Sequence, residues 1–300
     1  MSQPTSTIVI ATRNRPALLA ECLAGIARQD FSGNVEEVIV VDNSDNPTET
    51  KDVVTSAECR WPLSILFSSP PGVSRARNKG LFAARGDVTA FLDDDEVPKE
   101  DWLSELLAPF SLASQKVDIV AGDYVPEWGS PRPDWLADCY LGYYSTGLGW
   151  SDQPRLLKPS EWVLEGNIAV RTELLRRAGG FDERLGRAED SLVSCEGGAF
   201  DRLRKSGAVA YYNPQALVSH LIHADRLNKT WLLKRMFAQG VSQSILSETS
   251  GSPFPIPANV SVMLAALLAQ DPNDLEGEEL LILTQIFEIL GFICHRKGVL

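Results

Sequence analysis

Four consecutive acidic residues, 93–96, directly follow the apolar residues Phe91 and Leu92. Like charges oppose each other's ionisation, so neighbouring carboxylates are unfavourable unless a cation neutralises them. Hard divalent cations such as Mg2+ and Mn2+ prefer oxygen ligands and would serve this purpose. A solvated acidic turn is the alternative, and it needs no ligand. On these residues alone, both interpretations stay open.

The elements that must position these acids are visible in the first third of the chain. Four short apolar runs alternate with helical patterns, the first of which begins at Pro16. These runs, which we predict to be strands, are residues 7–11, 37–41, 63–67 and 88–92. Strands that alternate with helices imply crossover connections and a mainly parallel sheet.

Polar clusters follow three of these predicted strands, at residues 12–15, 42–45 and 93–96. In an open α/β sheet, ligands bind beyond the carboxyl ends of the strands. The three clusters are therefore expected to converge on one edge of the sheet. This convergence favours a binding site over an isolated acidic turn.

Composition excludes several classes of function. The chain has 300 residues, 44% hydrophobic and 23% charged, which is typical of a globular protein. Its formal net charge of -12 argues against general nucleic-acid binding, which needs an extended basic surface. Five scattered cysteines lack metal-ligand spacing and favour a reduced, cytoplasmic setting. With neither a signal segment nor a membrane-spanning stretch in view, we expect at most peripheral contact with the inner face of a membrane.

Read together, the polar clusters and later segments resemble the family-2 glycosyltransferases, which are nucleotide-sugar-dependent enzymes of the GT-A type. The motifs that carry the resemblance are IVIATRNR at 8–15, VVDNS at 40–44, ARNKG at 76–80, FLDDD at 91–95, GGFDE at 179–183 and VSH at 218–220. They occur in the family's order over about residues 5 to 245. The joint pattern is more specific than any single motif.

The resemblance implies an α/β fold: a single GT-A type domain with a mainly parallel sheet flanked by helices. The tail lies outside the resemblance, and its sequence pattern predicts a helical C-terminal extension. The domain would cover residues 1–246, with a nucleotide-binding half at 1–122 and an acceptor half at 123–246. Residues 247–300 would form a linker and a helical tail. Two short helices are expected in that tail, packed on the body or on a second copy of the chain in a homodimer.

The resemblance also assigns residues to the donor, a nucleoside diphosphate sugar. Thr12 and Asp42 would hold the nucleoside, and Arg77 with Asn78 would lie near the diphosphate. The remaining residues assigned to donor binding are Arg15, Arg75, Asp93 and Asp94. Asn43 stands where the family often has a second acid. A carboxylate suits Asp42's role because it accepts hydrogen bonds, and base and ribose groups donate them.

The resemblance also assigns residues to metal binding and to the general base, most of them later in the chain. Asp95, Asp93 and His220 would hold Mn2+ or Mg2+, which would stabilise the charge on the leaving nucleoside diphosphate. An inverting transfer also needs a general base for the acceptor hydroxyl. Two acids match the family's pattern imperfectly, Glu196 and Asp190, and both stay candidates.

The predicted function is therefore metal-dependent, inverting transfer of a sugar to a hydroxyl on a glycan, a lipid-linked glycan or another glycoconjugate, as in polysaccharide biosynthesis. Two alternatives remain. A sugar-phosphate nucleotidyltransferase would also combine an α/β sheet with a carboxylate-bound metal, but its usual glycine-rich phosphate loop is missing after the first strand. A non-catalytic protein that binds nucleotide sugars or glycans on the same fold is compatible with Gly197, which stands where a second acid is expected.

Overall fold

The computed structural model describes residues 3–186, 198–250 and 275–298. The chain divides into two compact units, each of which is described by itself. The first unit comprises Met1–Glu127, Ser145–Glu183 and Glu196–Leu221. The second comprises Trp128–Tyr144, Arg184–Cys195 and Ile222–Leu300.

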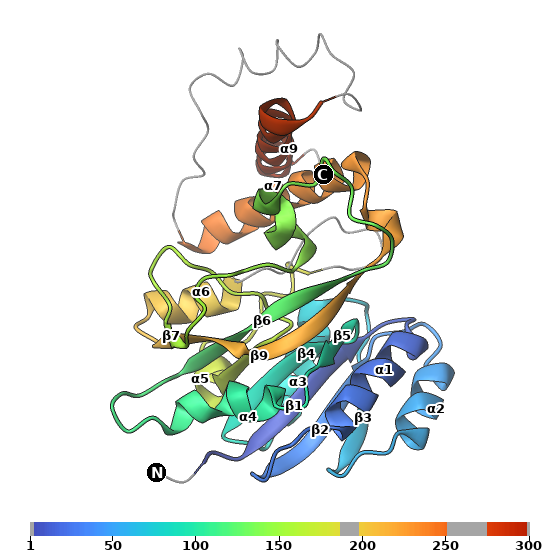
Figure 1. Cartoon of the computed structure of the whole chain (residues 1–300), viewed down its shortest axis with the longest axis vertical. Coiled ribbons are helices and arrows are strands. Elements are labelled where there is room, and N and C mark those ends of the chain that lie inside the picture. The colour runs from blue at the N-terminus through green and yellow to red at the C-terminus, as the bar shows by residue number, and fades with distance from the viewer. Residues whose placement is uncertain (1–2, 187–197, 251–274, 299–300) are drawn as a thin grey trace. The chain divides into compact units, whose positions relative to one another are not determined.

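The first unit is built on a twisted sheet (Figure 1). Its strands are β1 (Ser6–Thr12), β2 (Val35–Asp42), β3 (Leu63–Phe67), β4 (Val88–Asp93), β5 (Glu96–Pro98), β6 (Ile119–Trp128), β7 (Arg155–Leu156), β8 (Ile168–Arg171) and β9 (Ala210–Ile222). Their order is β3-β2-β1-β4-β8-β6-β9-β5, and β7 pairs with β9. The four strands from β3 to β4 are parallel, whereas β8 runs antiparallel to both β4 and β6.

The register of the parallel strands places their polar ends side by side. Thr12 at the end of β1 pairs with Asp42 at the end of β2, and Ala11 pairs with Asp93 at the end of β4. The expected convergence of the polar clusters on one edge is therefore present. The pairing of β5 with β9 brings a distant part of the chain next to the acidic run, because Glu96 in β5 pairs with His220 in β9.

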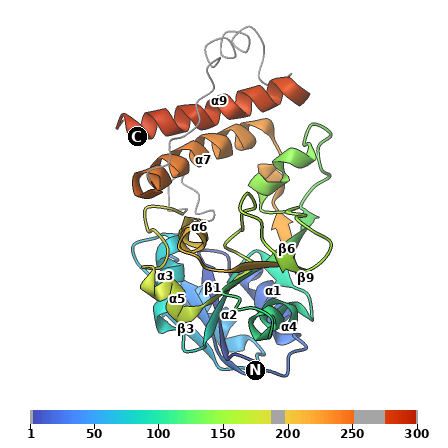
Figure 2. The same ribbon diagram turned by 90° about the vertical axis from the view of Figure 1, so that its left-hand side faces the viewer.

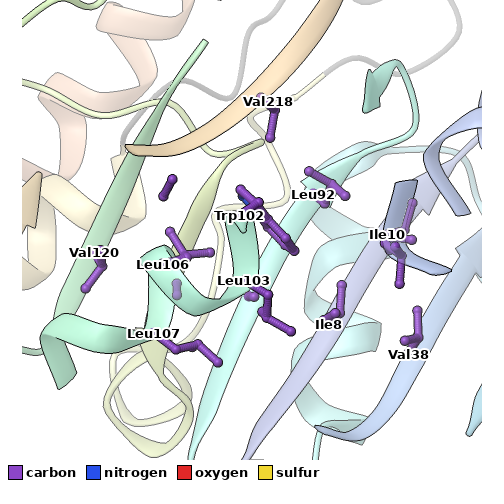
Figure 3. Packing of buried hydrophobic residues seen from close by; sticks show 14 of the residues in the cluster. Ile8, Ile10, Val38, Leu92, Trp102, Leu103, Leu106, Leu107, Val120 and Val218 are labelled. Carbon is purple, nitrogen blue, oxygen red and sulfur yellow. The ribbon is translucent and has the colours of Figure 1, made fainter. Parts of the chain in front are cut away.

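Helices cover both faces of this sheet. They are α1 (Pro16–Ala27), α2 (Thr48–Ser56), α3 (Val73–Ala83), α4 (Trp102–Leu107), α5 (Thr172–Arg177) and α6 (Gly198–Lys205). Successive side chains of a strand point to opposite faces. Ile8 and Ile10 belong to one core with residues of α1 and α4, and Figure 3 shows both isoleucines and Trp102 of α4 in this core. Val9 instead packs in the second core, which α3, α5 and α6 complete.

The predicted fold class is confirmed: the protein is an α/β fold with parallel strands flanked by helices and a helical C-terminal extension. The first helix begins at Pro16, as expected, since proline lacks the amide hydrogen that is unused in a first helical turn. Strand β9 runs from Ala210 to Ile222 and therefore contains His220.

The second unit is helical in the described residues. Its elements are two short 3-10 helices, η2 (Asp138–Tyr144) and η3 (Ala224–Arg226), with the long helices α7 (Lys229–Ser250) and α9 (Gly277–Arg296). Figure 2 shows α7 and α9 side by side. Their backbones approach so closely that a Cβ at Gly240 would collide with the carbonyl oxygen of Glu288, and a Cβ at Gly291 with that of Phe237.

The C-terminal region differs in detail from the expectation. Helix α7 continues to Ser250, into the stretch expected to be a linker, and the described part of the tail contains one helix of 20 residues, α9. Helix α9 packs against α7, and apolar residues of both helices share one core. None of the helices in the described residues has the length and apolar character to cross a membrane.

Candidate active site at the carboxyl ends of the parallel strands

Asp42 is the most deeply buried of the predicted donor-binding acids, with 1% of its surface exposed. Its Oδ1 accepts a hydrogen bond from the Ser44 amide at 2.8 Å. Its Oδ2 is buried and, within the described residues, has no hydrogen-bond partner. An unmet buried acceptor is unfavourable in the free protein, so a ligand that donates a hydrogen bond here would remove that cost.

Arg15 links β1 to the acidic run. This residue directly precedes α1, and its Nη1 lies 3.0 Å from Asp94 Oδ1 and 3.1 Å from Asp95 Oδ2. Thr12 Oγ1 donates to the other oxygen of Asp94 at 2.8 Å. Asp94 is thus held from both sides, and the guanidinium supplies part of the positive charge that the neighbouring acids require.

Arg77 supplies a second counter-charge and is itself 3% exposed. Its Nη2 lies 2.5 Å from Asp93 Oδ1, and its Nη1 lies 3.0 Å from Glu165 Oε2. Sequence reasoning did not single out Glu165. A signal was available, since an acid between the apolar pair Val163 and Leu164 and the strand at Ile168 needs a buried partner.

His220 reaches the acidic run through the β5–β9 pairing. Its Nε2 lies 3.8 Å from Asp95 Oδ1, and the amide of the next residue, Leu221, donates to the Asp95 carbonyl at 3.1 Å. Asp95 and His220 are both buried. Within the described part of the chain, no group of three or more His, Cys, Asp or Glu side chains is arranged to hold a metal ion.

The fourth acid of the run, Glu96, is directed into the core. Its Oε2 accepts the amide hydrogen of Asp93 at 3.1 Å, and 1% of its surface is exposed. Burial, followed by repulsion from Asp93 and Asp95, raises its pKa well above the ordinary value. Gly166 packs against both Glu96 and Asp93, and a Cβ at this position would collide with Glu96 Oε1.

The side chains of three other residues in or next to the motifs bind other parts of the protein: Asn43, Asn78 and Arg75. Asn43 donates to the Ser68 carbonyl at 2.5 Å and accepts from the Gly72 amide at 2.5 Å, so it closes the loop before α3. A carboxylate could not donate the first of these bonds, which explains an amide at this position.

Asn78 makes a similar pair of bonds. It accepts from the Phe181 amide at 2.8 Å and donates to the Phe181 carbonyl at 3.0 Å. Arg75, which is partly exposed, lies 3.0 Å from Glu183 Oε2. The structure therefore places Arg75 and Asn78 against the 181–183 loop, whereas Thr12, Arg15, Asp42, Arg77 and the acidic run lie at the strand ends.

The two candidates for the general base, Glu196 and Asp190, lie outside the described residues. A small pocket does open beside the acidic run. Its lining comprises Leu18, Glu21, Asp94, Asp95, Val97, Glu127, Ser219 and Leu221. There is accordingly space next to Asp95 for an ion or for part of a small ligand.

The sequence model described as Glycosyl transferase family 2 matches residues 7–178, which span β1 to α5 and include the acidic run. The chain belongs to this family. Named family-2 proteins are similar to this chain over part of their own length. A glucosyl-dolichyl phosphate glucuronosyltransferase of Haloferax volcanii is 28% identical over 177 residues, 58% of this chain and 56% of that protein. A pre-mycofactocin glycosyltransferase of Mycobacterium tuberculosis is 28% identical over 264 residues, 87% of this chain and 52% of that protein.

The chain thus spans about half the length of these relatives. Among solved structures, a mannosyltransferase from Pyrobaculum calidifontis, in complex with GDP-Man and Mn2+, resembles this family-2 chain with a TM-score of 0.63. The two are 18% identical, and the match covers 99% of this chain and 88% of the other. At this identity, the likeness establishes a shared fold.

The acidic run of this family-2 chain gives a testable pH dependence. Burial, followed by repulsion from Asp95, raises the pKa of Asp94 to about 7 from its ordinary value of 3.8, against the opposing effects of Arg15 and Thr12. Because the folded state holds the proton more tightly, Asp94 stabilises the fold below about pH 4, and this contribution is lost as pH rises through about 7.

An Asp94→Asn variant cannot lose this proton. In chelator, its melting temperature is expected to rise relative to wild type between pH 4 and pH 8, whereas the exposed Asp52→Asn control should follow wild type throughout. A constant difference between Asp94→Asn and wild type over this range would contradict the assignment.

Proposed function

We propose that this chain transfers a sugar from a nucleoside diphosphate sugar to a hydroxyl of a glycan, a lipid-linked glycan or another glycoconjugate. Support comes from membership of glycosyl transferase family 2 and from relatives that are named glycosyltransferases. The observation that carries the proposal is the buried Asp42 Oδ2 without a partner in the described residues, two strands away from the acidic run. The pairing of Thr12 with Asp42 and of Ala11 with Asp93 sets these acids around one strand end.

Asp42 would accept a hydrogen bond from the base or the ribose of the nucleoside. Its Oδ1 is already used by the Ser44 amide, so the ligand's donor would meet Oδ2. Asn43 would not contact the base in the way a second acid could, because its amide is bonded to Ser68 and Gly72. Recognition of the nucleoside would therefore depend on one carboxylate oxygen and on shape.

A divalent metal fits the other end of the site, where Asp95 and His220 are the residues that would hold it, with Asp93 beside them. Mg2+ is usually bound through one or two carboxylates together with substrate phosphates, so a complete protein cage is not required. The proposed ion, Mn2+ or Mg2+, would offset the charge that develops on the leaving nucleoside diphosphate. The structure of the Pyrobaculum mannosyltransferase, which contains GDP-Man and Mn2+, supports this choice.

In this proposal, Arg15 and Arg77 keep the acidic run compact before any ligand binds. Arg77 is enclosed by Asp93 and Glu165 and would act on the donor through Asp93. Transfer would proceed with inversion by a single displacement, with Glu196 or Asp190 as the base that takes the proton from the acceptor hydroxyl. Retained stereochemistry in the product would contradict this.

A thermal-shift panel tests the proposal. UDP, GDP, dTDP and CDP are each added with Mn2+ or with chelator, since a ligand that binds only the folded state raises its melting temperature. One nucleotide is expected to stabilise the protein strongly, and only when Mn2+ is present. With the matching nucleotide sugar, release of nucleoside diphosphate supports the proposal. Release of pyrophosphate would point to a nucleotidyltransferase, and stabilisation without any turnover to a non-catalytic binding protein.

A further inference from the structure

An exposed aromatic side chain, Phe67, stands at the end of β3, beside Asp42. The register of β2 and β3 pairs Phe67 with Asp42, and the amide of the next residue, Ser68, donates to the Asp42 carbonyl at 2.8 Å. Neighbouring strands lie about 4.8 Å apart, so the two side chains begin at adjacent positions on the edge of the sheet. Phe67 is 47% exposed, whereas Asp42 is 1% exposed. An accessible ring therefore adjoins a buried carboxylate.

Both side chains lie on the same face of the sheet. Side chains alternate along a strand, and Val40, two residues before Asp42, belongs to the core that includes residues of α1 and α4. Leu63, four residues before Phe67, packs against the same core, whereas Leu66, directly before Phe67, packs against the second core. A flat ligand on this face can therefore contact the ring of Phe67 and meet Asp42 Oδ2 together.

The backbone that carries Phe67 is held by both neighbouring elements. Ser68 is bonded to Asp42 through its amide, and its carbonyl accepts a hydrogen bond from the Asn43 side chain at 2.5 Å. The Phe67 carbonyl accepts a hydrogen bond from Lys79 Nζ on α3. A short aromatic side chain on a fixed backbone has little freedom to lose when a ligand packs on it, which favours binding.

A single exposed phenylalanine needs no explanation by itself, because apolar atoms make up much of any protein surface. The second, independent observation is Asp42 Oδ2, which is buried and has no hydrogen-bond partner in the described residues. We propose that the nucleobase of the donor stacks on Phe67 while an N–H of the same base donates to Asp42 Oδ2. This inference rests on the proposed function, in which Asp42 accepts a hydrogen bond from the nucleoside, and it assigns that bond to the base.

The two contacts differ in how they affect the choice of nucleotide. Every nucleobase has a π-face, so stacking on an aromatic side chain adds affinity with little discrimination between bases. The hydrogen bond discriminates, because the stacked base must present an N–H donor to Oδ2. Phe67 therefore determines how tightly nucleotides bind, and Asp42 determines which of them is preferred.

Loss of the ring is expected to weaken nucleotide binding. UDP, GDP, dTDP and CDP, each with Mn2+ or with chelator, are titrated calorimetrically into wild type, Phe67→Leu and Phe67→Trp. Phe67→Leu should bind the preferred nucleotide about tenfold more weakly, equivalent to about 1.4 kcal/mol, which is within the range measured for base–aromatic stacking. The rank order of the four nucleotides should not change. Phe67→Trp, which keeps a flat ring, should stay within about threefold of wild type.

Phe82→Leu is the matched control for these titrations. Phe82 is 58% exposed and lies in the last turn of α3, whereas the first turn of that helix follows the end of β3. This variant loses an exposed ring of the same kind, at the other end of the helix from Phe67. It should bind all four nucleotides as wild type does.

A second measurement detects the stacking contact itself. Phe67→Trp adds an indole at the proposed contact, and a stacked base is expected to quench its fluorescence. The signal is taken as the difference from wild type, because the chain already contains seven tryptophans. The added fluorescence of Phe82→Trp should not respond to nucleotide. This measurement needs no loss of affinity, so it also decides the question if Phe67→Leu does not fold.

The outcomes separate the inference from the proposed function. Wild-type affinity in Phe67→Leu, or added fluorescence in Phe67→Trp that a saturating nucleotide leaves unchanged, would overturn the inference while the proposed function stood. An equal loss of affinity in Phe67→Leu and Phe67→Trp, without quenching, would restrict Phe67 to a role in the fold. If none of the four nucleotides binds wild type, with or without Mn2+, the proposed function fails and the role of Phe67 fails with it.

Discussion

Replacing Asp95 by alanine is expected to abolish the Mn2+-dependent stabilisation by nucleotide and to slow release of nucleoside diphosphate by at least about a hundredfold. Loss of an outer partner of a metal ligand typically costs about ten- to a hundredfold, and loss of the ligand itself should cost more. The reason is geometric. Asp95 is the one residue of the acidic run that contacts both Arg15 and His220 in the distances given above.

The stability of Asp95→Ala without metal shows whether lost activity reflects loss of the metal site or unfolding of the protein. Removing Asp95 takes away a neighbouring negative charge that raises the pKa of Asp94, after the larger effect of burial. The variant is therefore expected to fold at least as stably as wild type in chelator, so lost activity would not reflect unfolding.

Asp52→Asn is the matched control, because Asp52 is an exposed acid on α2, away from the strand ends. It should keep wild-type activity and the wild-type response to Mn2+. Full Mn2+-dependent stabilisation of Asp95→Ala by the preferred nucleotide would show that the metal, if bound, is held elsewhere.

The positions of the acids could be predicted from sequence because they depend on local rules. Apolar runs such as residues 88–92 form strands, and polar residues at their ends, including Asp42 and Asp93, meet at one edge of a parallel sheet. His220 was named only through the resemblance, and its pairing with Glu96 could not be predicted from sequence.

What could not be predicted is how the charges are paired. The resemblance assigned Arg77 to the diphosphate, and nothing in the sequence around Arg77 indicates Glu165, 88 residues away. The structure shows that two arginines already neutralise part of the acidic run, so the initial argument that a metal must do so is weaker than the residues alone suggested. The proposed metal therefore depends on Asp95 and His220 lying next to each other.

Amide side chains show a related limit of sequence reasoning. Asn43 and Asn78 stand in motifs and Asn167 follows Gly166, yet each is bonded to backbone groups of distant segments. An asparagine's sequence context does not reveal whether it binds a ligand or closes a loop, because both uses need the same donor and acceptor atoms.

Asn167 is expected to be the most costly single asparagine to remove among these three. It is 1% exposed and joins three elements. Its Oδ1 accepts the indole hydrogen of Trp102 at 2.7 Å, and its Nδ2 donates to the carbonyls of Asp123 and Ala216 at 2.9 and 2.8 Å. Asn167→Ala would leave three polar groups in the core without these bonds.

Each buried polar group that loses its partner costs about 1–3 kcal/mol, so the loss of three partners in Asn167→Ala should lower the free energy of unfolding by about 3–9 kcal/mol. That is a large share of the roughly 5–15 kcal/mol that stabilises a typical domain. Urea denaturation of wild type and variant measures the difference. Asn34→Ala, at an exposed asparagine bonded to Glu36, should change it by less than about 0.5 kcal/mol.

A second variant tests the hydrogen bond between Trp102 and Asn167. Trp102→Phe keeps most of the apolar volume and removes the indole hydrogen, so its effect and that of Asn167→Ala should be less than additive when combined. Strict additivity would mean that the two residues stabilise the core independently. Because Asn167 follows Gly166, which packs against Asp93 and Glu96, the same loss should also weaken nucleotide binding in the presence of Mn2+. An Asn167→Ala protein with wild-type stability would show that the three bonds to Trp102, Asp123 and Ala216 do not hold this part of the sheet together.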